Sequence, residues 1–165
     1  MMSEEILQKV FDQSIRDITE RVGGIRLYQM NAPPNNSMCT VHVGFERGLE
    51  SILALHADLE VFTRLTRYML KSEEVTFQDV EDFATDFFNV LCGNITVRLF
   101  QATKVALRFS IPAFYVGIYR PDGHREQFAI HYSSDRNEAV RLIHYTPRDI
   151  FIERGDTYGK KNHGG

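Results

Sequence analysis

The sequence has no excess of positive charge and contains no tryptophan. It has 19 Lys and Arg against 22 Asp and Glu, which gives a formal net charge of −3. Nucleic-acid-binding proteins usually carry a basic stripe or patch, so this balance gives no general support for nucleic-acid binding. With 165 residues, of which 43% are hydrophobic, the chain can bury one substantial core. We therefore expect one globular domain.

The spacings typical of metal sites and nucleophilic enzymes are also absent. Cys39 and Cys92 stand in unrelated segments and form no C-x-x-C pair, so we expect two reduced, buried thiols. The six histidines form no H-x-x-x-H or H-E-x-x-H pattern, and no serine stands in a G-x-S-x-G motif. We therefore expect no metal or cofactor bound by this chain itself.

Long apolar runs are missing as well. No segment approaches the roughly 18 consecutive apolar residues that a membrane helix needs. The first ten residues, MMSEEILQKV, are acidic and do not have the basic-then-apolar order of a secretory signal. We expect a cytoplasmic protein without a membrane segment.

Capping residues and hydrophobic periodicity predict three helices and a sheet. Ser3 is expected to cap the first helix, Asp58 the second, and Thr76 with Asp79 the third. The predicted helices cover 3–24, 59–70 and a stretch from 76 that contains 79–95. The predicted strands are 25–30, 38–45, 49–56, 105–111, 113–119, 126–133 and 138–146.

Turn chemistry and alternation predict how the strands pair. The short link after 38–45 predicts a hairpin with 49–56, and Pro121 followed by Asp122 and Gly123 predicts a second hairpin, between 113–119 and 126–133. The alternating residues on the apolar face of the 38–45 strand are Cys39, Val41, Val43 and Phe45. The element order predicts an α/β (α+β) fold over 1–150, with one mixed, mainly antiparallel sheet and about three helices packed on it. Residues 151–165 are expected to form a flexible tail.

The third helix has an apolar side and, nearly opposite, a polar side. At 100° per residue, the predicted core side consists of Val80, Ala84, Phe87, Phe88, Leu91 and Ile95. The opposite side consists of Asp82, Asp86, Asn89, Gly93 and Val97. Gly and Asn are both unfavourable inside a helix, by about 1 kcal/mol relative to Ala for Gly. Their presence favours a surface that another molecule approaches closely; the alternative is an ordinary helix end at Gly93 and Asn94, with solvated neighbours.

These residues carry a resemblance to the CheX-type chemotaxis phosphatases of the CheC/CheX/FliY family. The family motif is E-x-x-N-x-x-x-G-N, and the sequence here has Asp86, Asn89, Gly93 and Asn94 in the same frame. The segment FSIPAFYVG at 109–117 is similar to the strand-proline-strand element of the family, and VHVGFERGLESILALH is similar to its hairpin. The resemblance extends from about residue 3 to residue 146.

The resemblance implies a phosphatase that acts on the aspartyl-phosphate of a CheY-type response-regulator receiver. It assigns Asn89 to orienting the attacking water and Asp86 to docking on the receiver's lysine. Gly93 permits close approach, and Mg²⁺ belongs to the receiver. The acid departs from the family, because Asp86 is one methylene shorter than Glu; Asp82, one turn earlier on the same face, is a candidate to compensate.

Three alternatives remain open at this point. The chain is a phosphatase, a non-catalytic module of the same family that binds a receiver, or an unrelated structural protein. Some family members carry a second site on the first helix, but here Glu20 stands where the Asn would be, so we expect one site. The family also implies a homodimer joined through sheet edges.

Overall fold

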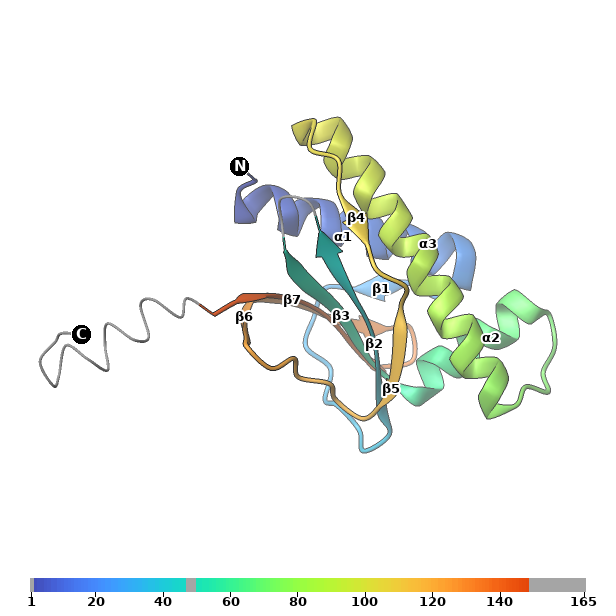
Figure 1. The fold of residues 1–165 in the computed structure, drawn as a ribbon. Helices are drawn as coiled ribbons and strands as arrows, with labels where there is room; N and C mark the ends of the chain where they lie inside the picture. Colours follow the sequence, from blue (N-terminus) through green and yellow to red (C-terminus); the bar gives the residue numbers. More distant parts are fainter. Residues whose placement is uncertain (1, 47–49, 149–165) are drawn as a thin grey trace, which may run out of the picture.

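A computed structural model describes residues 2–46 and 50–148. Figure 1 shows how its helices and strands are arranged. In chain order they are α1 (Glu4–Gly23), β1 (Leu27–Tyr28), β2 (Met38–Glu46), β3 (Ser51–Asp58), α2 (Leu59–Leu70), α3 (Phe77–Thr103), β4 (Arg108–Phe109), β5 (Ala113–Val116), β6 (His124–Ser134) and β7 (Ala139–Pro147). The tail predicted at 151–165 lies outside the described residues. No helix in the described part of the chain combines the length and hydropathy that a membrane crossing requires.

The helix ends follow from local sequence chemistry. The hydroxyl of Ser3 accepts a hydrogen bond from the backbone N–H of Ile6 at 3.2 Å, and α1 ends at Gly24 with φ of 68°. Before α3, the Thr76 and Asp79 side chains each accept from the other's backbone N–H, at 3.0 and 2.9 Å. This reciprocal capping box confirms the prediction for the start of α3.

The second predicted cap has a different role. Asp58 stands at the N-cap position of α2, but its side chain makes no capping hydrogen bond. Its carboxylate instead accepts from the backbone N–H of Ala139 at 3.1 Å and of Asn35 at 3.4 Å. Asp58 therefore joins the loop before β2 to the start of β7. Helix-capping rules consider only neighbouring residues, so they do not predict this long-range contact.

The sheet is antiparallel at every pairing between described strands. Its order is β1-β6-β7-β3-β2, and β4 and β5 both pair with β2 as an interrupted outer strand. The predicted hairpin of β2 and β3 is confirmed, with Val41 opposite Leu55. The alternate β2 residues predicted to face the core are Cys39, Val41, Val43 and Phe45, and all four are buried.

The second predicted hairpin is wrong. Gly123 does turn the chain, with φ of 72°, but β5 pairs with β2 whereas β6 pairs with β7 and β1. The connection between β5 and β6 therefore crosses from one side of the sheet towards the other (Figure 1). The Phe114 ring on β5 lies 6.0 Å from the rings of Phe62 and of Phe77, and these contacts hold β5 beside the helices.

One face of the sheet carries the main core. Helices α1 and α3 pack against each other over this face, and α2 packs against α3 (Figure 1). The opposite face has a smaller buried cluster of Ala54, Ile143 and Tyr145. Both cysteines are buried, as expected, and burial raises the pKa of the Cys92 thiol. The core thus holds α3 rigidly along its inner side and leaves its outer side in solvent.

Candidate functional site

The length of α3 decides between the two interpretations of Gly93. The helix continues past Gly93 to Thr103, and Lys104, with φ of 64°, provides its C-terminal cap. The alternative of a helix end at Gly93 and Asn94 is therefore wrong. Gly93 lies in the interior of a regular helix, where it is unfavourable by about 1 kcal/mol relative to Ala.

The inner side of α3 is the predicted one. Its members Val80, Ala84, Phe87, Phe88, Leu91 and Ile95 are each at most 3% exposed. Cys92 and Leu99 extend the same buried side towards the C-terminus. This burial fixes the rotation of α3 about its own axis, so the direction of every outward side chain is fixed as well.

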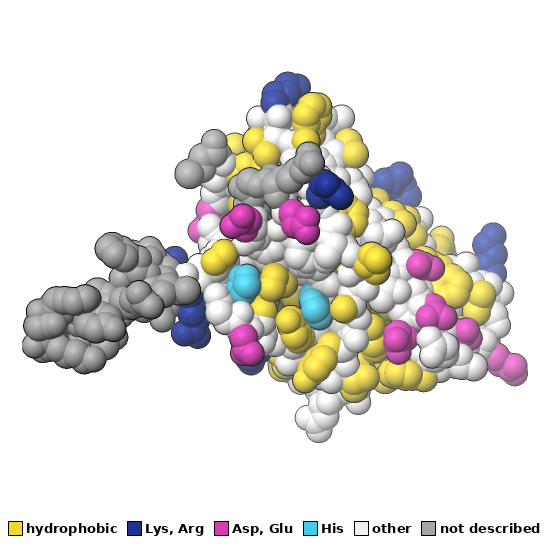
Figure 2. Space-filling view, viewed as in Figure 1, with side chains coloured by type: hydrophobic (Ala, Val, Ile, Leu, Met, Phe, Trp, Pro, Cys, Tyr) yellow, Lys and Arg dark blue, Asp and Glu magenta, His cyan; other side chains and the backbone are white. Residues whose placement is uncertain are grey.

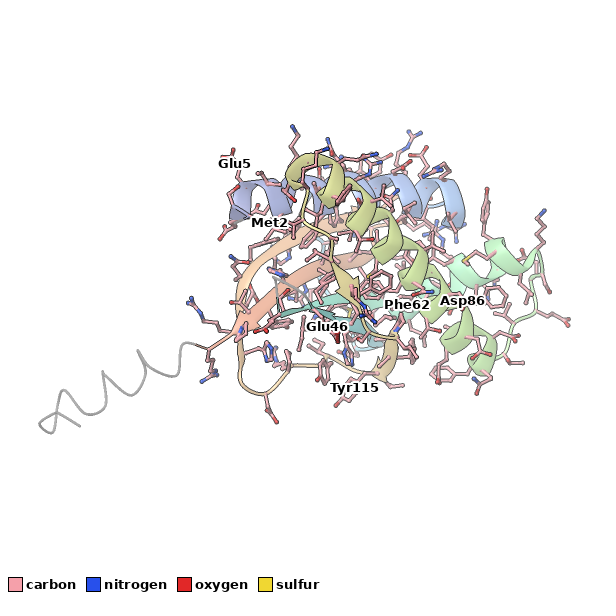
Figure 3. All side chains as sticks on the ribbon, turned by 45° about the horizontal axis from the view of Figure 1, so that its top comes forward. Met2, Glu5, Glu46, Phe62, Asp86 and Tyr115 are labelled. Carbon is pink, nitrogen blue, oxygen red and sulfur yellow. The ribbon has the colours of Figure 1, made fainter. Side chains whose placement is uncertain are left out.

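The outward side presents polar groups without partners. Asp86 and Asn89 are exposed, and within the described part of the chain neither side chain makes a hydrogen bond or an ion pair. Figure 3 labels Asp86 on this helix. Three residues apart on one helix, the two side chains can act on the same bound group. A ligand could therefore bind their hydrogen-bonding groups without breaking any of the described contacts.

The other two predicted residues flank this pair. Asp82 is exposed, and its carboxylate accepts from the Gln78 amide at 2.9 Å. A Cβ built onto Gly93 would have no atom within 4 Å, so the absence of a side chain there leaves open space. Nothing inside the described part of the protein requires glycine at this position. A requirement for glycine would come from a molecule that approaches the helix from outside.

Asn94 does not belong to this surface. Its side-chain oxygen accepts from Nε of Arg98 at 2.9 Å, and Arg98 also donates to Asp17 of α1 at 3.2 Å. The amide is thereby part of the contact between α1 and α3. Of the motif residues, Asp86, Asn89 and Gly93 face solvent together, whereas Asn94 serves helix packing.

The charge around the site is negative. Between Lys71 and Arg98 the sequence has six acids and no Lys, Arg or His. The six acids are Glu73, Glu74, Asp79, Glu81, Asp82 and Asp86. In Figure 2 acidic side chains gather over the N-terminal part of α3. The motif did not reveal this acidic surface, but a count of charges along the sequence would have found it. A positively charged partner surface would be attracted to it.

The equivalent frame on α1 has no free polar pair. Asp17 accepts from Arg21 at 2.9 Å and from Arg98 at 3.2 Å, and Glu20 pairs with Arg26 at 3.3 Å. A Cβ on Gly24 would come within 2.5 Å of the Tyr68 ring. The three α1 residues at the corresponding positions therefore all contact other residues of the protein, whereas their counterparts on α3 face solvent.

The histidines do not form a site with the acids. Over residues 2–46 and 50–148, His, Cys, Asp and Glu side chains nowhere gather in a group of three that could hold a metal ion. His144 is buried, with Nδ1 at 2.6 Å from Gln127 Oε1 and Nε2 at 2.8 Å from Ser51 Oγ, and burial lowers its pKa to about 4. His56 is 1% exposed on the opposite face of the sheet; burial and the charge of Arg141 lower its pKa to about 4.

Comparison with solved structures identifies the fold. Neither a protein-family model nor a curated protein matches the sequence. The structure matches the chemotaxis protein CheX from Desulfovibrio desulfuricans with a TM-score of 0.70 and 14% identity, over 84% of this chain and 97% of that one. It also matches FliY from Thermotoga maritima with a TM-score of 0.60 and 11% identity, over 98% of this chain and 100% of that one. The fold is that of the CheX/CheC-like chemotaxis proteins and FliY.

One matching structure contains a second protein. It is the CheX–CheY–BeF3–Mg²⁺ complex from Borrelia burgdorferi, with a TM-score of 0.63 and 17% identity, over 88% of this chain and 97% of that one. At these identities the comparisons establish the architecture of this chain.

Proposed function

We propose that this protein is a phosphatase that hydrolyses the aspartyl-phosphate of a CheY-type receiver domain in chemotaxis or another two-component pathway. The observation that carries the proposal is the exposed pair of Asp86 and Asn89, which have no partner among the described residues, with open space over Gly93, on a helix of a CheX-like fold. A relative of this fold has been crystallised with CheY, BeF3 and Mg²⁺, which supports a receiver as the partner. Such a substrate places the protein in the cytoplasm.

The proposed reaction needs no nucleophile from this chain. A water oxygen attacks phosphorus, the bond from phosphorus to the receiver's aspartyl oxygen breaks, and inorganic phosphate leaves as the carboxylate is restored. The water's proton passes to the phosphate or to solvent. Mg²⁺ bound by the receiver neutralises negative charge on the phosphoryl oxygens. The phosphatase therefore has to position the water and hold the two proteins together.

Asn89 is suited to positioning the water. Its amide has an acceptor oxygen and two N–H donors, so it can accept from the water and donate towards a phosphoryl oxygen. Because no hydrogen bond from the described residues occupies the amide, docking would break none of the described contacts. The buried inner side of α3 holds the backbone at Asn89 in place, which matters because a misplacement of about 1 Å can reduce a rate about 100-fold.

Asp86 is suited to docking. Its carboxylate can form a charge-assisted hydrogen bond with a lysine ammonium group near the phosphoryl site. Asp82 lies one turn earlier on the same face and adds negative charge beside it. Gly93 lies one turn beyond Asn89, where the missing side chain lets the partner's backbone come close to the helix.

A non-catalytic receiver-binding module is the second candidate. The observation that favours it is the Asp at position 86, because an Asp side chain is about 1.5 Å shorter than the Glu of the family motif. If that reach limits catalysis, the same surface would bind a receiver without fast hydrolysis. The two candidates share the docking surface and differ only in the rate of phosphate release.

We also propose a homodimer through sheet edges. Strand β5 pairs with β2 on one side, and no other described strand pairs with it. On this outer strand Tyr115 is 47% and Val116 65% exposed. An unpaired, apolar strand edge readily pairs with another strand. Sedimentation of the full chain tests for the dimer.

The deciding experiment measures phosphate release from a phosphorylated CheY-type receiver with Mg²⁺. Wild type should accelerate release, and Asn89→Ala should reduce the acceleration about 100-fold while the receiver still binds. Asn89 is exposed and Ala is the better helix former, so this replacement should keep the thermal midpoint or raise it slightly. A large loss of stability in Asn89→Ala would show that Asn89 is structural.

Asp86→Glu separates the two candidates in the same assay. A phosphatase with sufficient reach should be equally active or more active with Glu. A wild type that binds the receiver without accelerating release, and gains activity only as Asp86→Glu, would indicate the binding module. Absence of both binding and acceleration would contradict both.

A further inference from the structure

The outward side of α3 continues beyond Gly93 as an apolar surface. Val97 is 56% and Phe100 47% exposed, and Lys104 Nζ lies 5.7 Å from the centre of the Phe100 ring. At 100° per residue these two side chains project within about 60° of Asp86 and Gly93. Figure 2 shows hydrophobic side chains gathered at the top of the view, where α3 ends. One face of the helix is thus acidic in its first half and apolar in its second, with Gly93 between the halves.

The acidic half is too short to hold a partner protein by itself. From Asp86 to Gly93 the helix rises only about 10 Å. A specific protein complex usually buries about 800 Å² on each partner. Exposed charge pairs contribute little to affinity, whereas the contribution of buried apolar surface grows with its area. A stable complex therefore needs an apolar contact near the acids.

The direction of that contact follows from the helix. A partner that lies close to the backbone at Gly93 meets Val97 one turn later, because both residues lie on the same line along α3. Val97 and Phe100 are about 16 and 21 Å from Asp86 along the helix axis. The surface thus fits a partner with a cationic group at one end and an apolar patch about 16–21 Å away.

We propose that Val97 and Phe100 form an affinity contact for the receiver domain whose phosphoryl group meets Asn89. This inference rests on the proposed function, and its occupant is the receiver because the acidic and apolar halves form one continuous face. Val97 and Phe100 determine how tightly the receiver binds. Asn89 lies two turns from Val97 and determines how fast the bound receiver is hydrolysed.

The test is the double variant Val97→Gln with Phe100→Gln, compared with Met30→Gln. Glutamine is a good helix former, and all three side chains are about half exposed, so each variant should fold; the thermal midpoint of each variant is measured first. Met30 lies at the β6 side of the molecule, beside Ile130 and His131, and serves as the matched control. Receiver binding is measured directly, and phosphate release is measured over a range of receiver concentrations.

We expect the double variant to raise both the dissociation constant and the half-saturating receiver concentration about ten-fold, with the maximal rate within two-fold of wild type. Met30→Gln should change neither. Unchanged binding in the double variant, with hydrolysis that still depends on Asn89, overturns this inference and leaves the proposed function standing. A wild type that neither binds nor hydrolyses the receiver overturns both. Conversion of a dimer to a monomer by the double variant would assign the surface to a second copy of this chain and overturn the inference.

Discussion

Helices α1 and α3 carry the same spacing of acid, polar residue and glycine, but they use it in opposite ways. On α1, Asp17 and Glu20 form ion pairs, and Gly24 ends the helix against the Tyr68 ring. On α3, Asp86 and Asn89 have no partner within the described part of the chain, and Gly93 borders open space. The difference shows that the spacing does not make a site. The site that we propose lies where these groups make no contacts within the described part of the protein.

Replacing Asp86 on α3 and Asp17 on α1 should give the largest difference between the two helices. Asp86→Ala should reduce phosphate release at low receiver concentration about 30-fold or more, because the receiver's lysine loses its charged partner. Its free energy of unfolding should stay the same or rise slightly, because Asp86 is exposed, has no partner within the described part of the chain, and Ala is the better helix former. Asp17→Ala should leave phosphate release unchanged and reduce stability by about 0.5–1 kcal/mol, because Arg98 and Arg21 lose a half-exposed partner. Paired rate and urea-unfolding measurements check both.

An effect of Asp17→Ala on hydrolysis would contradict this difference between α1 and α3. If Asp17→Ala impaired hydrolysis as much as Asp86→Ala did at equal stability, α1 would carry a second site, and the ion pairs of Asp17 would have to open when the receiver docks.

Acid should destabilise the sheet through its two buried histidines, His144 and His56. The His144 ring lies 5.5 Å from Phe11 of α1, and burial lowers the pKa of His144 to about 4. The unfolded chain takes up a proton near pH 6.5, so stability is lost as pH falls from 6.5 towards 4. The pKa of His56 is lowered to about 4 in the same way. At pH 5 each histidine should lower the free energy of unfolding by about 2 kcal/mol relative to pH 7.5.

Urea unfolding at both pH values checks this expectation, and His56→Phe provides the control. His56 is 1% exposed and its lowered pKa comes first from burial, so Phe should fill the same buried space and should remove about half of the pH dependence. A pH dependence that is the same in His56→Phe and in wild type would show that His56 does not contribute.

The two glycines should respond with opposite sign to alanine. Gly93→Ala should stabilise the protein by about 0.5–1 kcal/mol, because the helix interior favours Ala and the added Cβ has open space. Gly24→Ala should destabilise it by about 1 kcal/mol, since φ is 68° and the Tyr68 ring must move.

Thermal unfolding measures these effects, and receiver binding sharpens them. Gly93→Ala should weaken receiver binding although the fold becomes more stable, and Gly24→Ala should leave binding unchanged. Equal binding by wild type and Gly93→Ala would mean that the partner does not approach the helix at this position.

Much of this protein could be predicted locally. The Ser3 cap, the capping box of Thr76 and Asp79, the alternation in β2 and the two sides of α3 all depend on neighbours within about one turn or one strand. A periodic pattern records such neighbours directly, because the backbone geometry of helices and strands repeats every few residues. The orientation of Asp86, Asn89 and Gly93 followed from this repeat.

Contacts between segments far apart in the sequence could not be predicted from such local patterns. The pairing of β5 with β2, the two backbone amides that Asp58 binds and the link from Arg98 to Asp17 each join residues far apart in the chain. Side-chain packing determines these partners. For example, Phe114 packs against Phe62 and Phe77, and these contacts hold β5 beside the helices and not beside β6. Whether an acid stays free or enters an ion pair is settled in the same way. The sequence therefore specifies which residues face outward on α3, and the packing of α1 against α3 specifies which polar groups are left for a partner.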